Sequence, residues 1–154
     1  MRSALTLFDR ALAWFGAALL ACLMATVLAG IVTRGLGDPL SWTDEGARFL
    51  MVWLASSGWM IATRKRGHVR IRFFQNLLPM HLWDGTERAI QASLVLLGVV
   101  IAWFAVDLVG RNADLEATSL PISMAWMYAP LIPAGALTAA QGVAQLFSPG
   151  AKGG

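Results

Sequence analysis

Four long stretches of this 154-residue chain contain no Asp, Glu, Lys or Arg, and they limit the possible folds more than any other feature. They are Ala11–Thr33, Phe49–Thr63, Ala89–Val106 and Ala117–Ala151. A helix crosses the hydrocarbon core of a bilayer with about 20 apolar residues. Since 57% of the residues are hydrophobic and only 14% are charged, against roughly 25% in a soluble domain, we expect most of the chain to lie in lipid.

The first two stretches each predict one membrane span. The first is longer than the apolar core of a cleaved signal peptide, about 7–15 residues, so we expect it to remain as a helix. The second has only 15 residues. Ser41 with Asp44 three residues later fits a capping box, which predicts a helix that begins at Trp42 and ends near Thr63.

The last two stretches complete the predicted layout. Asp107 closes the third, and Pro121 suits an early position of the fourth helix. Pro130 and Pro133 then lie inside that helix, where prolines usually cause a kink. The sequence therefore predicts an all-α integral membrane domain over 1–154, with spans at about 11–33, 42–63, 87–107 and 121–147.

The basic residues predict the orientation. With four spans, the N-terminus, the middle loop and the tail share one side, and they hold nine of the twelve Lys and Arg residues. Cytoplasmic loops carry such an excess. We therefore expect both termini in the cytoplasm of a bacterium, with the chain as a multi-pass protein of the inner membrane.

The middle loop gives a set of candidate residues for the cytoplasmic interface. They are Arg64, Arg66, His68, Arg70 and Arg72. Within the stretch from Val69 to Trp83, the apolar side chains Phe73, Phe74, Leu77 and Leu78 share one helical face, which predicts a short amphipathic helix on anionic membrane lipid. An ordered loop packed on the helix ends is the alternative.

A charged cluster at the start of the second span is the first candidate for a contact with another subunit. Asp44 and Glu45 lie four and three residues before Arg48, so both can reach it on one helix face. One interpretation is an ion pair at the membrane interface. The other is a polar contact to a partner subunit, because ionisable groups at membrane depth normally face protein or water.

Alanines at four-residue spacing predict helix packing, because small side chains let helices approach closely. The pattern does not decide between packing within this chain and packing against another. The alanines are Ala17, Ala21, Ala25 and Ala29 in the first span and Ala136, Ala140 and Ala144 in the fourth.

The predicted spans lack the histidines that ligate haem and the paired cysteines that disulfide chemistry needs. His68 and His81 both fall in the cytoplasmic loop, and Cys22 has no second cysteine to pair with. Topology explains the basic residues better than nucleic-acid binding does. We expect no catalytic residue, metal or cofactor, and we expect the chain to be a subunit of a larger assembly.

The second span and the loop after it resemble the small membrane subunit, the DctQ type, of the tripartite ATP-independent periplasmic (TRAP) transporters. That family's pattern is Trp-x-x-Glu-x-x-Arg, an apolar span with an internal glycine, a basic turn and His-[Ile/Val]-x-[Ile/Val]-acid. The matching positions are Trp42, Glu45, Arg48, Gly58, Arg64, His68, Val69 and Ile71, while Leu120, Pro121, Tyr128 and Pro133 resemble the punctuated last helix. Arg72 departs from the pattern, since the family commonly has an acid there.

The resemblance implies a function that composition cannot give. Such subunits scaffold a large permease subunit of about twelve helices during sodium-coupled uptake of an organic acid, which a periplasmic solute-binding protein delivers. Trp42, Asp44, Glu45, Arg48 and Gly58 become subunit-contact candidates. Because the chain ends at Gly154, we expect the large subunit to be separate. The alternative function is a small membrane anchor of a redox or signalling complex.

Overall fold

The computed structural model describes residues 2–64 and 80–146, with side chains described from residue 7 onward and, in the second range, for residue 85 and from residue 88 onward. Within these ranges the chain is helical, and an isolated bridge between Glu116 and Ser123 is its one β-type pairing. The helices are α1 (Arg2–Gly35), α2 (Trp42–Arg64), α4 (Met80–Arg111), α5 (Ala125–Tyr128) and α6 (Leu131–Leu146). The predicted all-helical class is confirmed for this part of the chain.

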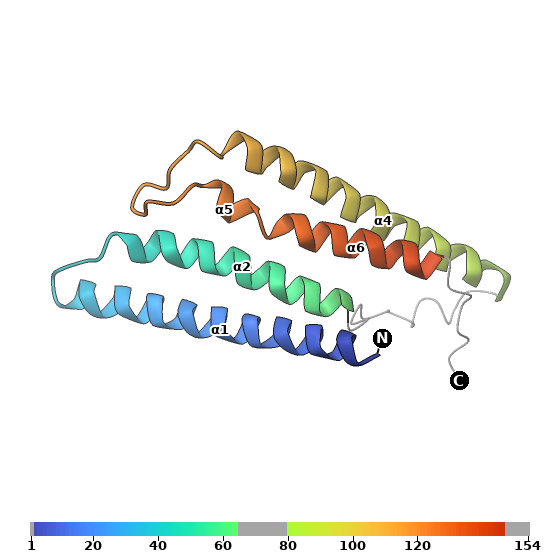
Figure 1. Ribbon diagram of the computed structural model, residues 1–154, viewed down its shortest axis with the longest axis horizontal. Helices are drawn as coiled ribbons and strands as arrows, with labels where there is room; N and C mark the ends of the chain where they lie inside the picture. The colour runs from blue at the N-terminus through green and yellow to red at the C-terminus, as the bar shows by residue number, and fades with distance from the viewer. Residues whose placement is uncertain (1, 65–79, 147–154) are drawn as a thin grey trace.

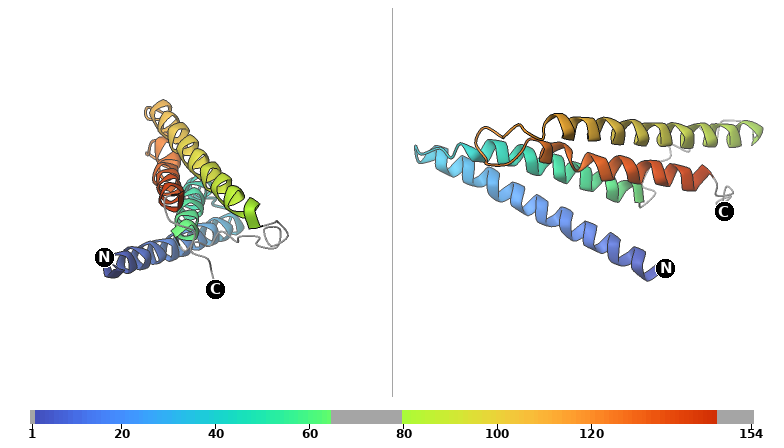
Figure 2. Two further views of the ribbon diagram at one scale, coloured as in Figure 1. Left: turned by 90° about the vertical axis from the view of Figure 1, so that its right-hand side faces the viewer. Right: turned by 45° about the horizontal axis from the view of Figure 1, so that its top comes forward.

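The long helices lie side by side, with α2 and α6 between α1 and α4 (Figures 1 and 2). α1 packs on α2, α2 on α6, and α6 on α4. The connections 36–41 and 112–124 lie at one end of the molecule, which we call the loop end. The start of α1 and the ends of α2 and α6 lie at the other, the terminal end (Figure 1).

α1 contacts α2 through a regular seam of side chains. The residues of α1 that are at least half-covered recur at alternating spacings of three and four, a spacing that keeps one helix face against a neighbour. The residues of this seam are Asp9, Leu12, Gly16, Leu19, Leu23, Thr26, Gly30 and Thr33. Ala29 lies beside the seam and is half-buried, and every other residue of α1 from Leu7 onward is exposed.

α4 and α6 approach so closely that their backbones touch. A Cβ atom added at Gly98 would lie 2.5 Å from the amide N of Ala139 and 2.8 Å from the carbonyl O of Gly135. One added at Gly135 would lie 2.8 Å from the amide N of Ala102. Glycine is therefore required on both helices at this crossing, because any side chain would meet backbone atoms that cannot move aside.

The fourth apolar stretch differs from the continuous helix expected at 121–147. Residues 112–124 form a loop, and the helix that follows is divided into α5 and α6 at Ala129 and Pro130. Proline has no amide hydrogen, so it removes the hydrogen bond that would join the two segments. The predicted kink is a break in the helix.

Two helices are long and apolar enough to cross a membrane by themselves, over Leu7–Gly35 and Arg88–Arg111. α2 begins with Asp44, Glu45 and Arg48 inside its first two turns, and α6 has only 16 residues. Neither helix is among the two that are long and apolar enough to span a membrane by themselves.

Candidate subunit-contact surface

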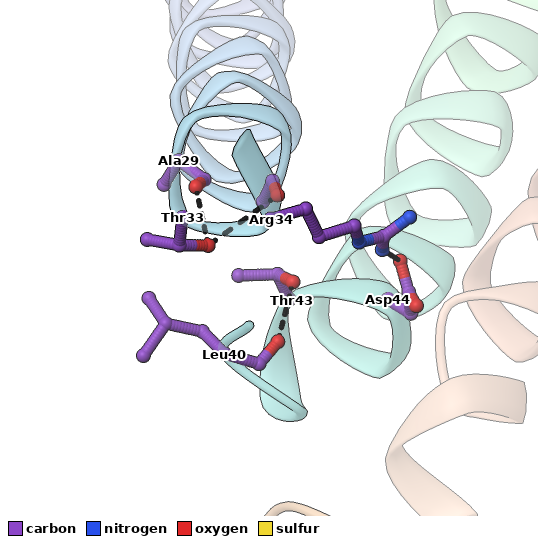
Figure 3. Close-up of polar contacts among 7 residues, drawn as sticks. Ala29, Thr33, Arg34, Leu40, Thr43 and Asp44 are labelled. Carbon is purple, nitrogen blue, oxygen red and sulfur yellow. Dashed lines mark hydrogen bonds and ion pairs between the residues drawn. The ribbon is translucent and has the colours of Figure 1, made fainter. Parts of the chain in front are cut away.

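The loop end of the α1–α2 hairpin is closed by short polar contacts (Figure 3). The Arg34 guanidinium pairs with the Asp44 carboxylate, and both side chains are more than half exposed. The Thr43 hydroxyl donates to the carbonyl O of Leu40 at 2.8 Å, and Thr43 itself is buried against Gly30. Asp44 thus contacts α1 and is not paired with Arg48.

Glu45 joins the two halves of the molecule. Its carboxylate accepts hydrogen bonds from the backbone N–H groups of Thr118 at 2.9 Å and Ser119 at 2.5 Å. These residues lie more than 70 positions away, in the loop between α4 and α5. A carboxylate that accepts two backbone N–H groups fixes the loop through charge-assisted hydrogen bonds.

The loop over 112–124 is ordered by its own hydrogen bonds. The amide of Ala117 donates to the carbonyl of Ile122 at 2.9 Å, and the amide of Met124 donates to that of Leu115 at 2.8 Å. The Ser123 hydroxyl lies 2.8 Å from the carbonyl O of Ala113 and accepts from the amide of Ala125 at 3.1 Å. Glu45 therefore binds a loop whose conformation is already fixed by hydrogen bonds within the loop.

Arg48 points out of the molecule. It is exposed, and the structure gives it no hydrogen bond or ion pair with any residue of 2–64 or 80–146. The predicted cluster is thus divided among three directions: Asp44 contacts α1, Glu45 contacts the 112–124 loop, and Arg48 is left on the surface.

Arg48 begins a face of α2 that nothing in the described chain covers. Its exposed members continue at spacings of three and four residues as Met51, Ala55, Gly58 and Ala62, and we call this set the α2 outer face. A Cβ atom added at Gly58 would meet no atom within 4 Å. Trp42 is also exposed, at 40%, and its ring lies 3.6 Å from a Cβ placed on Gly46.

An aromatic group ties α2 to the break before α6. The indole Nε1 of Trp53 donates to the carbonyl O of Trp126 at 3.0 Å, and the two rings stack with centroids 6.3 Å apart. The helical partner of that carbonyl would be the amide of residue 130, which is proline and has no hydrogen to donate. Trp53 supplies the missing donor. Phe15 of α1 meets the same indole edge-on.

A second ion pair closes the terminal end of the α1–α2 hairpin. Arg64 Nε lies 2.5 Å from Asp9 Oδ1, and the guanidinium carbon is 4.8 Å from the centre of the Phe8 ring. The Arg64 side chain is only 17% exposed. The candidate Arg64 is therefore held within the chain. The other candidates of the basic loop, Arg66, His68, Arg70 and Arg72, lie outside the described residues.

The alanines singled out by their spacing are on the surface and not in the seams, except for Ala29, which lies beside the α1–α2 seam. Ala17, Ala21 and Ala25 are exposed and Ala29 is half-buried. The members on α6 are exposed as well, namely Ala136, Ala140 and Ala144. Glycines make the close α4–α6 contact. Among the described residues, no three His, Cys, Asp or Glu side chains gather where they could hold a metal ion.

Sequence reasoning missed Trp53, Gly98 and Asp9. For Trp53 a signal exists in Pro130, because a proline within a helix leaves a carbonyl four residues earlier in need of a donor. For Asp9, a signal exists in its position near the start of the first helix of a hairpin whose second helix ends in the basic residue Arg64. Nothing in one sequence shows that Gly98 and Gly135 face each other.

Comparison with known proteins places this chain in a family. Residues 23–149 match the family described as tripartite ATP-independent periplasmic transporters, DctQ component. The chain is 36% identical over 118 residues to the sialic acid TRAP transporter small permease protein SiaQ of Vibrio cholerae. The aligned region covers 71% of this chain and 64% of SiaQ.

Two further relatives extend the comparison. The chain is 28% identical to the ectoine TRAP transporter small permease protein TeaB of Halomonas elongata, over 71% of this chain and 60% of TeaB. It is also 28% identical to the sialic acid TRAP transporter permease protein SiaT of Haemophilus influenzae, over 77% of this chain and only 19% of SiaT. The chain thus spans less than two thirds of each of these relatives. Since the family match covers most of the sequence, the chain belongs to the DctQ component family of the tripartite ATP-independent periplasmic transporters.

Proposed function

We propose that this chain is the small permease subunit of a TRAP transporter and that it scaffolds a large permease subunit. The observation that carries the proposal is the family match over residues 23–149. The similarity to SiaT adds to it, because a region like this chain there forms 19% of a much longer permease protein. A region that shares one polypeptide with the rest of a permease has a reason to pack against it.

In this proposal the chain spans the inner membrane four times, with α1, α2, α4 and the α5–α6 pair as the spans. The loop end faces the periplasm and the terminal end faces the cytoplasm. α1 and α4 have 34 and 32 residues, or about 51 and 48 Å, which exceeds a hydrocarbon core of about 30 Å. They would therefore tilt or extend into the interfaces.

The exposed side chains support this placement. The outer surfaces of α1 and α4 carry bulky apolar residues, among them Trp14, Leu20, Leu96 and Trp103, each at least half exposed. Lipid tails can cover such surfaces and water cannot do so without cost. The acids Asp38, Asp114 and Glu116 lie with others at the loop end, while α2 ends in Arg64 at the opposite, terminal end. This distribution agrees with the positive-inside bias of the sequence.

The proposed role is mechanical and not chemical. The two helix pairs, fixed by the glycine crossing, Glu45 and Trp53, give a frame on which a moving permease could slide. The substrate would be an organic acid taken up with sodium through sites in the large subunit. A periplasmic binding protein would deliver it, and the loop end is the side of this chain that such a protein could meet.

The test is co-purification. The tagged chain would be extracted in mild detergent from the membranes of its own host, and its partners would be identified by mass spectrometry. We expect a large polytopic permease at equal stoichiometry. Recovery of a soluble dehydrogenase, or a visible haem spectrum, would contradict the scaffold and support the anchor function.

Transport assays separate the scaffold from mere association. Reconstituted with the large subunit and the binding protein, the complex should take up its organic acid only when a sodium gradient is present. The Glu45→Ala variant should assemble poorly and transport slowly, because the 112–124 loop loses its carboxylate partner. Normal co-purification and normal uptake in that variant would count against a structural role for Glu45.

A further inference from the structure

We propose that Arg48 pairs with a carboxylate of the large permease subunit and that the α2 outer face packs on a helix of that subunit. This inference rests on the proposed function, since it names the surface through which the small subunit would contact its partner. Its basis is the position of Arg48, the absence of an acid for it within the described chain, and the small side chains beside it.

The acids closest to Arg48 in sequence already have other partners. Asp44 pairs with Arg34, and both Glu45 oxygens accept backbone N–H groups of the 112–124 loop. The other arginines at the loop end have carboxylates, because Arg34 contacts Asp44 and Arg111 contacts Asp107 at 2.9 Å. Among these three, Arg48 is the one for which the described residues supply none.

The depth of Arg48 makes an unpaired charge expensive. It lies six residues after Trp42, which places it about 9 Å along the axis of α2. α2 has 23 residues and a length of about 34 Å, close to the thickness of the bilayer core. A guanidinium near that depth normally faces protein or a water-filled cavity and finds an anion there.

The side chains beside Arg48 distinguish a protein partner from lipid. Beyond Met51 the α2 outer face carries only Ala55, Gly58 and Ala62. α4 exposes bulky apolar side chains along its length, and α1 does so between its exposed alanines Ala17, Ala21 and Ala25. The α2 outer face differs because its small residues follow an arginine, Arg48, and have no bulky apolar residue among them after Met51. Small residues at spacings of three and four allow a second helix to approach closely, and lipid tails have no need of them. The planar guanidinium also matches a carboxylate in a two-point contact.

We therefore expect the α2 outer face to be covered by a transmembrane helix of the large subunit that carries Asp or Glu near its periplasmic end. A lipid phosphate could satisfy Arg48 as well, and that outcome is built into the test. The tagged chain is co-expressed with its large permease as wild type, Arg48→Glu, Arg48→Lys and Arg111→Glu. Arg111 is the matched control, because it is also exposed at the loop end but has Asp107 as its partner.

We expect Arg48→Glu to reduce recovery of the large permease at least about tenfold, since breaking a buried charge pair costs more than the 1.4 kcal/mol that a tenfold change requires. Arg48→Lys should keep part of the recovery and Arg111→Glu nearly all of it. The membrane content and melting temperature of each variant show whether the small subunit itself still folds.

A photo-crosslinker identifies what covers the surface. Benzoylphenylalanine at Met51 should form an adduct with the large permease, while the same group at Leu96 of α4 should label phospholipid. Phospholipid labelling at Met51 together with normal recovery of Arg48→Glu would overturn the inference and leave the scaffold function intact. Failure of the wild-type chain to recover any large permease would instead refute the proposed function.

Discussion

The two helical hairpins of this chain are held together in different ways. The α4–α6 pair is joined by backbone contact, because Gly98 and Gly135 let the two helices touch without side chains between them. The α1–α2 pair is joined by a side-chain seam and by one ion pair at each end, Arg34 with Asp44 and Arg64 with Asp9. A larger residue at the α4–α6 crossing can therefore be accommodated only if the two helices move apart. In the α1–α2 hairpin, neighbouring side chains can move to accommodate it.

The largest expected effect comes from a substitution at the crossing of α4 and α6. Gly98→Ala should destabilise the protein by roughly 1–3 kcal/mol, because the new methyl group would overlap the Ala139 amide and the Gly135 carbonyl. Thermal unfolding in detergent, followed by tryptophan fluorescence, measures the change. Gly110→Ala is the control, since no atom lies within 4 Å of a Cβ placed there. Equal melting temperatures for the two variants would show that the crossing is looser than described.

The next substitution tests whether the α1–α2 hairpin is adjustable. Gly30→Ala should cost about 1 kcal/mol, because the new Cβ would lie 2.9 Å from the Thr43 hydroxyl oxygen. That neighbour is a side chain, so adding Thr43→Ala should restore much of the lost stability. No equivalent rescue exists for Gly98, whose neighbours are backbone. A double variant as unstable as Gly30→Ala alone would contradict the distinction between the hairpins.

A third substitution addresses the contact between the hairpins. Trp53→Phe keeps an aromatic ring but removes the indole N–H, leaving the Trp126 carbonyl without its donor from α2. We expect a loss of about 1 kcal/mol, the usual net contribution of one hydrogen bond. Trp59→Phe, on the same helix, controls for the change in fluorescence. Identical unfolding of the two variants would mean that the hydrogen bond adds nothing to stability.

The smallest expected effects come from the end pairs of the α1–α2 hairpin. Asp9→Asn should cost between about 0 and 1 kcal/mol, as partly exposed ion pairs do. Asp44→Asn should cost less, because Arg34 and Asp44 are both more than half exposed. The two variants are compared in low and high salt, where screening should shrink the differences further. A loss above 2 kcal/mol for either would show that the ion pairs, and not the seam, hold this hairpin.

The sequence predicted those features of the fold that depend on local chemistry. α2 begins at Trp42, the position that Ser41 and Asp44 indicated. The prolines of the last stretch marked an interruption, although they did not show that α5 and α6 separate completely. The helical class followed from the uncharged stretches, since a chain in lipid must satisfy its backbone hydrogen bonds within helices.

The candidate contacts were harder to predict because their partners lie far away in the sequence. Glu45 was singled out beside Arg48, but its partners are the amides of Thr118 and Ser119, and a backbone amide leaves no mark in a sequence. Alanine spacing pointed to surfaces that the described chain leaves exposed. The seams instead use Gly98, Gly135 and the mixed residues of α1, whose pairing depends on how the hairpins meet.

The bond from Trp53 to the broken helix has a consequence for how these two positions can vary. A single carbonyl, that of Trp126, can be satisfied by an indole from α2 or by an amide at position 130, but proline excludes the second. Loss of the indole N–H alone, as in Trp53→Phe, should therefore be harmful while Pro130 is present and nearly neutral once Pro130 is Ala. The dependence runs in one direction: related chains that lose the tryptophan at position 53 are expected to lose the proline at position 130 as well.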